Sequence, residues 1–129
     1  MNFCLVVLSS PYGSEAPLRA ARFARALLEQ SHEVGQVFFY DEGTYTGLGS
    51  AVSPQGEQSA VEAWGALQQE HNLELILCIG SAIKRGILDA NEAQRHEHPA
   101  STIHPAFTLA GLGQLVDASS RCDRLVSFG

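Results

Sequence analysis

The sequence is poor in basic residues: its 129 residues include one lysine, Lys84, and seven arginines against fourteen acidic residues. The formal net charge is −6. Tight, sequence-independent binding to nucleic acid requires a basic face that neutralises phosphates. We therefore expect no direct contact with nucleic acid, so that any link to RNA would pass through a partner protein.

Long apolar runs and a leader pattern are also missing. No run approaches the roughly 18 to 20 apolar residues that a helix needs to span a bilayer. The segment Met1–Cys4 leads directly into a strand-like run, without a basic region or a small-residue cleavage site. We expect a cytoplasmic protein without membrane attachment.

Cysteine is scarce, and Cys4, Cys78 and Cys122 form no CxxC pair. This absence weakens both a zinc site and a thioredoxin-type redox centre. A cytosolic protein should also keep its thiols reduced. The segment His96–His98, with His104, has metal-ligating residue types, but it is polar and proline-flanked and lacks a second acidic or cysteine ligand nearby. We expect no metal ion and no other cofactor.

Apolar runs alternate with stretches of helical spacing along the whole chain. The pattern predicts strands at 2–8, 34–40, 73–78 and 125–128, and helices at 17–30, 59–70, 79–85, 89–95 and 108–118. The segment 99–107 has the weakest pattern, and no run marks a fourth strand before the last one. The alternation predicts an α/β sandwich with a mainly parallel sheet. No repeat or linker divides the chain, so we expect a single domain over 1–129.

Cys78 is the residue on which chemistry is most expected. It ends the apolar run 73–78, and a predicted helix begins at Ile79. Reacting groups and ligands collect at the carboxyl ends of parallel strands, and a helix amino terminus favours a thiolate over a thiol. The alternative is a strand-end cysteine that only fills space. Lys84 and Arg85 follow within two turns and add positive potential, which favours the reactive interpretation.

The surroundings of Cys78 favour sulfur transfer over hydrolysis. No histidine is adjacent in sequence to serve as a base, and His71 precedes the strand. Thiol exchange or sulfur transfer needs no base once the thiolate has formed. We expect backbone N–H groups near Gly80 and Ser81, together with Lys84 or Arg85, to stabilise an anionic sulfur.

Three other features receive less weight. Cys4 lies within an apolar strand and is interpreted as core. Cys122 has arginines beside it but follows a helix instead of preceding one, which makes reactivity less expected. The loop Ser9–Gly13 precedes a helix, where an anion can bind, yet it matches no nucleotide fingerprint. A nucleotide-binding module and a structural subunit with an inert thiol remain alternatives.

Several segments together resemble the DsrE/TusD family of sulfur-relay proteins, and the TusD-type members most closely. These segments are the loop Pro11–Gly13 after the first strand, Val37–Tyr40 with Glu42-Gly43, Cys78 followed by Arg85-Gly86, Phe107–Leu109 with Gly111–Gly113, and Cys122–Val126. The resemblance runs nearly from end to end.

This resemblance implies a three-layer, flavodoxin-like α/β/α sandwich with a five-stranded parallel sheet. It implies a sulfurtransferase that carries sulfane sulfur as a persulfide on Cys78. TusB-like and TusC-like subunits would complete a heterohexamer, a TusA-like protein would donate the sulfur and a TusE-like protein would accept it. The pathway would be 2-thiouridine formation at the tRNA wobble position. The alternatives are a DsrE-type relay in sulfur oxidation and a non-catalytic subunit of a related hetero-oligomer.

Overall fold

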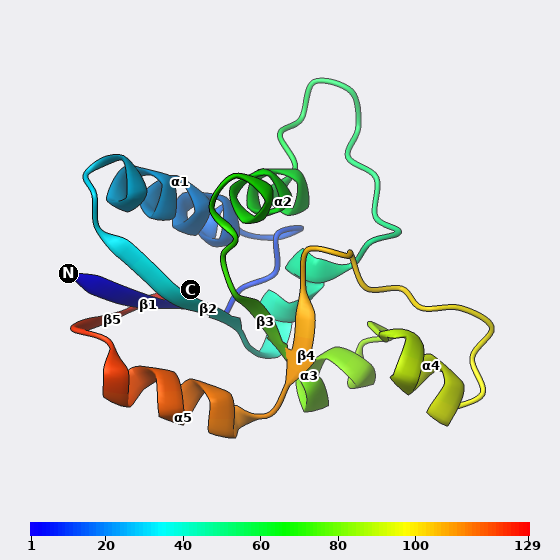
Figure 1. The fold of residues 1–129 in the computed structure, drawn as a ribbon. Helices are drawn as coiled ribbons and strands as arrows, with labels where there is room; N and C mark the ends of the chain where they lie inside the picture. The colour runs from blue at the N-terminus through cyan, green and yellow to red at the C-terminus, as the bar shows by residue number, and fades with distance from the viewer.

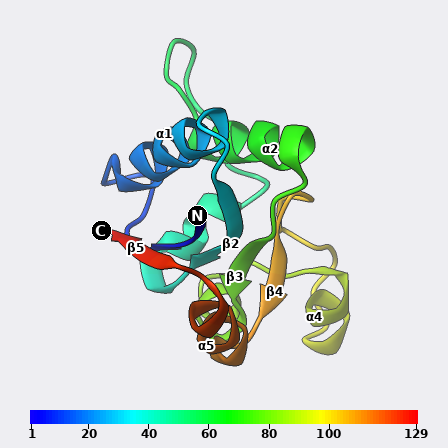
Figure 2. The same cartoon turned by 60° about the vertical axis from the view of Figure 1, so that its left-hand side comes forward.

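The computed structural model describes residues 1–129, whose five strands form one parallel sheet with helices on both faces (Figures 1 and 2). The strands are β1 (Asn2–Val7), β2 (Glu33–Phe39), β3 (Leu75–Cys78), β4 (Thr108–Ala110) and β5 (Arg124–Phe128). Their order across the sheet is β4-β3-β2-β1-β5, and every neighbouring pair is parallel. The expected three-layer α/β/α sandwich with five parallel strands is confirmed.

The helices begin and end largely where capping residues predict. They are α1 (Ala16–Glu29), the 3₁₀ helix η1 (Asp41–Gly47), α2 (Ala60–His71), α3 (Ile79–Lys84), α4 (Ala90–Arg95) and α5 (Leu112–Arg121). The Asp89 side chain accepts a hydrogen bond from the Glu92 N–H at 2.8 Å and so caps α4. Gly86 follows α3 with φ +79°, the left-handed stop that the sequence predicts. No helix combines the length and the apolar character needed to cross a bilayer.

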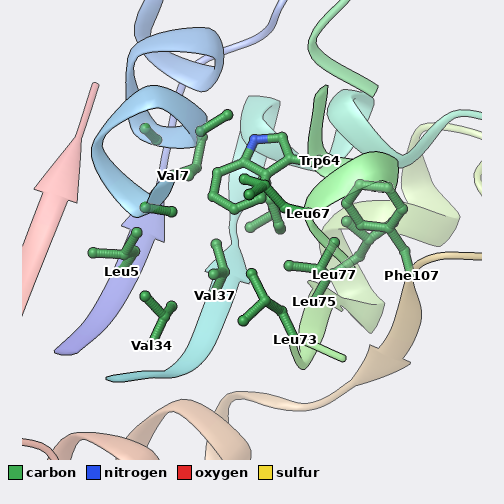
Figure 3. Packing of buried hydrophobic residues seen from close by; sticks show 14 of the residues in the cluster. Leu5, Val7, Val34, Val37, Trp64, Leu67, Leu73, Leu75, Leu77 and Phe107 are labelled. Atoms are coloured by element: carbon green, nitrogen blue, oxygen red, sulfur yellow. The ribbon is translucent and has the colours of Figure 1, made fainter. Parts of the chain in front are cut away.

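Alternation along the strands divides the core between the two faces of the sheet. Leu5, Val37 and Leu77 pack with Trp64 of α2 and with α1 on one face (Figure 3). The Trp64 indole N–H donates to the Pro17 carbonyl at 3.0 Å, which joins α2 to the start of α1. On the other face, Phe38, Ile76 and Cys78 pack against Leu115 of α5 and Ala110. The Cys78 side chain therefore lies on the α5 side of the sheet.

The predicted helix over 108–118 is wrong at its beginning. Residues 108–110 form β4, the strand that the sequence pattern does not mark, and α5 begins only at Leu112. Leu77 pairs with Leu109 and Cys78 with Ala110 in the parallel register. Because Leu109 and Leu112 also fit helical spacing, a strand of three residues is hidden in the local pattern.

The polar stretch after β2 opens with the helix η1. Its Gly43 lies so close to β1 that an added Cβ would come within 2.1 Å of the Val7 carbonyl oxygen. Thr44 and Thr46 are fully buried. The segment is thus held against the carboxyl ends of the central strands, beside α3.

Candidate functional site

Cys78 is the last residue of β3 and the N-cap residue of α3. This position at the strand–helix junction is the one that the sequence predicts. All four residues of β3 are buried, and Cys78 retains 6% of its accessible surface. Ala110 and Leu115, both partly buried, pack against the cluster that holds it. In the isolated chain the thiol is therefore less accessible than the sequence-based interpretation expects.

The side chains around Cys78 come from the sheet and from one helix. Phe38, Ile76 and Ala110 belong to strands of the sheet, whereas Leu115 belongs to α5. Beside Cys78 in the chain, a Cβ added to Gly80 would have no atom within 4 Å.

Arg85, expected to stabilise an anionic sulfur, is held by carboxylates instead. Its guanidinium donates to Asp41 at 2.6 Å and to Glu42 at 2.8 Å, and also to the Ser81 carbonyl at 3.0 Å. The hydrogen bond to Glu42 and the two negative charges raise the pKa of Arg85 above its ordinary value. Two carboxylates thus offset this charge, and the Arg85 contacts join α3 to η1.

Ser81 is part of the same junction. Its hydroxyl oxygen accepts a hydrogen bond from the Asp41 backbone N–H at 3.1 Å. Asp41 has φ +53°, a left-handed conformation uncommon for a residue with a side chain. Ser81 and Arg85 thereby fix η1 on α3, and they position the first turn of α3 next to Cys78.

Lys84 is the other basic residue predicted to act on Cys78, and it belongs to α3. It is exposed and forms no salt bridge. An open groove of about 460 Å³ is lined by Lys84 and Gly80 of α3 together with His96 and His98, which follow α4. In the sequence these two histidines lie in a polar, proline-flanked segment, and only the folded chain brings them beside Lys84.

Cys4 and Cys122 lie apart from Cys78 and close to each other. Cys4 is buried in β1 as expected, and its thiol donates to the Ala118 carbonyl at 3.6 Å. Cys122 follows α5 as its C-cap residue. Sequence reasoning considered the three cysteines singly and missed this pair. No group of three or more His, Cys, Asp or Glu side chains is arranged to hold a metal ion.

The loop Ser9–Gly13 offers little to an anion. The helix that follows it begins with Ala16, whose N–H donates to the Ser14 hydroxyl at 3.0 Å, and with Pro17, which has no N–H. Glu15 places a carboxylate at the cap position. Because these features remove donors and add negative charge, the nucleotide-binding alternative finds no support at this helix end.

The family follows from comparison with known proteins. The model of the DsrE/DsrF-like family matches residues 1–128. The chain belongs to the DsrE/DsrF-like family. It is 40% identical to DsrE of Allochromatium vinosum over 129 residues, which cover 100% of this chain and 99% of that protein. It is 41% identical over 128 residues to the sulfurtransferase TusD of Salmonella dublin, covering 99% of this chain and 100% of that one.

A solved structure has the same fold as this member of the DsrE/DsrF-like family. The crystal structure of the YchN protein from E. coli superimposes with a TM-score of 0.80, at 20% sequence identity, over 99% of each chain. At that identity the likeness concerns the fold alone. It agrees with the five-stranded parallel sheet and its two helical layers.

Proposed function

We propose that the chain is a sulfur-relay sulfurtransferase that carries sulfane sulfur on Cys78. The observation that carries this proposal is the position of Cys78, at the carboxyl end of a central parallel strand and at the cap of a helix, in a chain related over its full length to a sulfurtransferase TusD. Cys4 lies within β1 and Cys122 ends a helix, whereas Cys78 precedes a helix start, so Cys78 is the cysteine best placed to receive sulfur.

The proposed reaction has two exchange steps. The Cys78 thiolate attacks the terminal sulfur of a donor persulfide, the donor S–S bond breaks, and the donor leaves as a thiolate. Cys78 then holds the sulfur as a persulfide. An acceptor thiolate attacks that outer sulfur and releases the Cys78 thiolate, so one sulfur atom moves without net oxidation.

The first turn of α3 would stabilise the persulfide anion. The leading N–H groups of a helix have no intrahelical acceptor, and those near Gly80 and Ser81 follow Cys78 directly. Lys84 would add a positive charge from the adjacent groove. Arg85 acts indirectly in this proposal, because its bonds to Asp41 and Glu42 hold α3 in place.

Access to Cys78 would involve partner proteins. With 6% of its surface exposed, the thiol needs a movement of the α5 start before a donor can reach it. We propose that TusB-like and TusC-like subunits bind this chain in a heterohexamer, that a TusA-like protein donates the sulfur, and that a TusE-like protein accepts it. The pathway we propose is 2-thiouridine formation at the tRNA wobble position. The chain is 41% identical to a TusD and 40% identical to a DsrE, so a DsrE-type relay in sulfur oxidation is the alternative pathway.

Persulfide loading tests the proposal. The purified chain, with its partner subunits co-expressed, is incubated with glutathione persulfide, and peptides are examined by mass spectrometry. We expect the Cys78 peptide to gain the mass of one sulfur atom, and Cys78→Ser to lose this gain while keeping its fold. Cys122→Ser is the matched control and should load normally. Equal loading of the Cys78→Ser variant would refute the assignment.

A second candidate is a structural subunit whose Cys78 thiol is inert, and the burial of Cys78 favours it. Alkylation separates the two functions. In the assembled complex, a working Cys78 should react with iodoacetamide faster than Cys4, whereas an inert one should react as slowly as Cys4. Slow alkylation together with absent loading would support the structural subunit.

A further inference from the structure

Two cysteines that the proposed sulfur transfer does not use meet at the end of α5. The Cys4 thiol donates to the Ala118 carbonyl oxygen at 3.6 Å, and the Cys122 backbone N–H donates to the same oxygen at 3.1 Å. The Cys122 thiol donates to the neighbouring Ser119 carbonyl at 3.7 Å. Both thiols therefore contact carbonyls of the last turn of α5, although 117 residues separate the two cysteines in the sequence.

The two thiols differ in exposure, which gives them different roles. Cys4 retains 3% of its accessible surface, whereas Cys122 is only partly buried. In the sequence Arg121 precedes Cys122, and Asp123 and Arg124 follow it. Because Cys122 is the more exposed of the two thiols, an oxidant from solvent reaches it first.

A small cavity of about 100 Å³ lies against Cys4. Gln36, Glu74, Arg121 and Ala118 are among the residues that line it. The Gln36 side chain is buried, with 3% of the residue exposed, and its Oε1 atom has no hydrogen-bond partner. The cavity thus leaves open space beside the Cys4 side chain, on the side of Ala118 and Arg121.

The electrostatics agree with this contact. Burial, and after it the hydrogen bond and charge of Cys122, raise the pKa of Cys4 to about 12. Arg121 acts in the opposite direction. Cys4 is therefore a protonated thiol at rest, and Cys122 is the better candidate for the first attack on an oxidant.

We propose that Cys4 and Cys122 form a redox pair that a peroxide converts to an intramolecular disulfide. The Cys122 thiolate attacks one peroxide oxygen, the O–O bond breaks, and hydroxide leaves and takes up the thiol proton as water. Cys122 is then a sulfenic acid. Cys4 loses its proton and attacks the Cys122 sulfur, the S–O bond breaks, and the hydroxide takes up that proton as a second water. Two thiols are oxidised to one disulfide and one peroxide is reduced to two waters.

The disulfide would join β1 to the end of α5. Since Leu115 of α5 packs against the cluster that holds Cys78, such a link would restrain the helix whose movement the proposed function requires for access to the sulfur. The formation of the disulfide does not involve Cys78. It can therefore be tested whether or not Cys78 carries sulfur.

The test treats the purified full-length chain with hydrogen peroxide and digests it without reduction. We expect a peptide joining Cys4 to Cys122, reversed by dithiothreitol, with Cys78 as the remaining free thiol out of three. Cys78→Ser is the matched control and should form the same link. Cys122→Ser should abolish it, and Cys4→Ala should leave Cys122 as sulfenic or sulfinic acid. Circular dichroism checks that each variant is folded.

Three results would overturn the proposal. In the wild-type chain, Cys122 oxidised to sulfinic acid while Cys4 stays free would show that Cys4 does not resolve the sulfenic acid. A Cys122–Cys122 link between two molecules would show an intermolecular reaction. A link that includes Cys78 would place the redox partner at the sulfur site.

Discussion

The guanidinium of Arg85 lies 2.6 Å from the carboxylate of Asp41. This ion pair joins α3, which follows Cys78, to η1, which follows β2. The Arg85 side chain is 15% exposed, while that of Asp41 is 59% exposed, so the pair lies at the rim of the sheet's carboxyl edge. The position of α3 relative to the strands therefore depends on a charged contact as well as on apolar packing.

Arg85→Ala should destabilise the chain. The substitution removes three hydrogen bonds and leaves two carboxylates adjacent without a cation. Because the partners are partly solvated, we expect a loss of about 1–2 kcal/mol in the free energy of unfolding. Urea unfolding measures it. Arg19→Ala is the control, since Arg19 forms only an exposed pair with Glu15 at 3.9 Å, and its effect should be near zero. Equal effects of the two substitutions would contradict the structural role.

Gly43→Ala should impair folding because the new Cβ would come within 2.1 Å of the Val7 carbonyl oxygen. That atom belongs to the backbone of the central strand β1, which cannot yield without disturbing the sheet. We expect a loss of more than about 2 kcal/mol, or no soluble protein. Gly80→Ala is the matched control, since nothing lies within 4 Å of its added Cβ, and it should fold normally. Thermal unfolding compares them, and a stable Gly43→Ala variant would show that η1 lies farther from β1.

Stability at alkaline pH should depend on Cys4. Burial raises the pKa of Cys4 to about 12 from its ordinary value of 9.0. Above pH 9 the unfolded chain therefore releases this proton while the folded chain retains it, so the free energy of unfolding falls as the pH rises toward 12. Cys4→Ala lacks this contribution and should lose stability less steeply. Tyr12, whose pKa is also raised, is present in both proteins and cancels in the difference. Parallel curves from urea unfolding at several alkaline pH values would contradict the prediction.

The sequence predicts the elements that have strong local signals. The apolar runs locate β1, β2, β3 and β5, and Asp89 and Gly86 mark helix ends through capping chemistry that acts over a few residues. β4 escapes prediction because three residues paired with β3 carry too little periodicity to differ from the helix that follows. Short elements gain their identity from pairing, which a local pattern does not contain.

The sequence predicts the position of the candidate site but not the long-range contacts around it. The place of Cys78 follows from local order, since a strand is followed by a helix. The contacts of Arg85 with Asp41, and of Cys4 with the end of α5, join residues 44 and 114 positions apart. Charge in the sequence indicates that Arg85 is a cation near Cys78, but only the packing of η1 shows which carboxylates neutralise it.

Leu115→Ala should open Cys78 to reagents. Leu115 is a partly buried residue of α5 that packs against the cluster containing Cys78, and truncation removes three of its carbon atoms from that cover. We expect the rate of Cys78 alkylation by iodoacetamide in the isolated chain to rise several-fold at constant pH, because access limits the reaction of a thiol that is 6% exposed. Val116→Ala is the matched control on the same helix, since Val116 is 67% exposed and covers nothing at the site. Cys4, under the far end of α5, should keep its slow rate in both variants. An unchanged Cys78 rate in folded Leu115→Ala would mean that α5 is not the barrier, and that a donor protein must approach Cys78 from the side of α3.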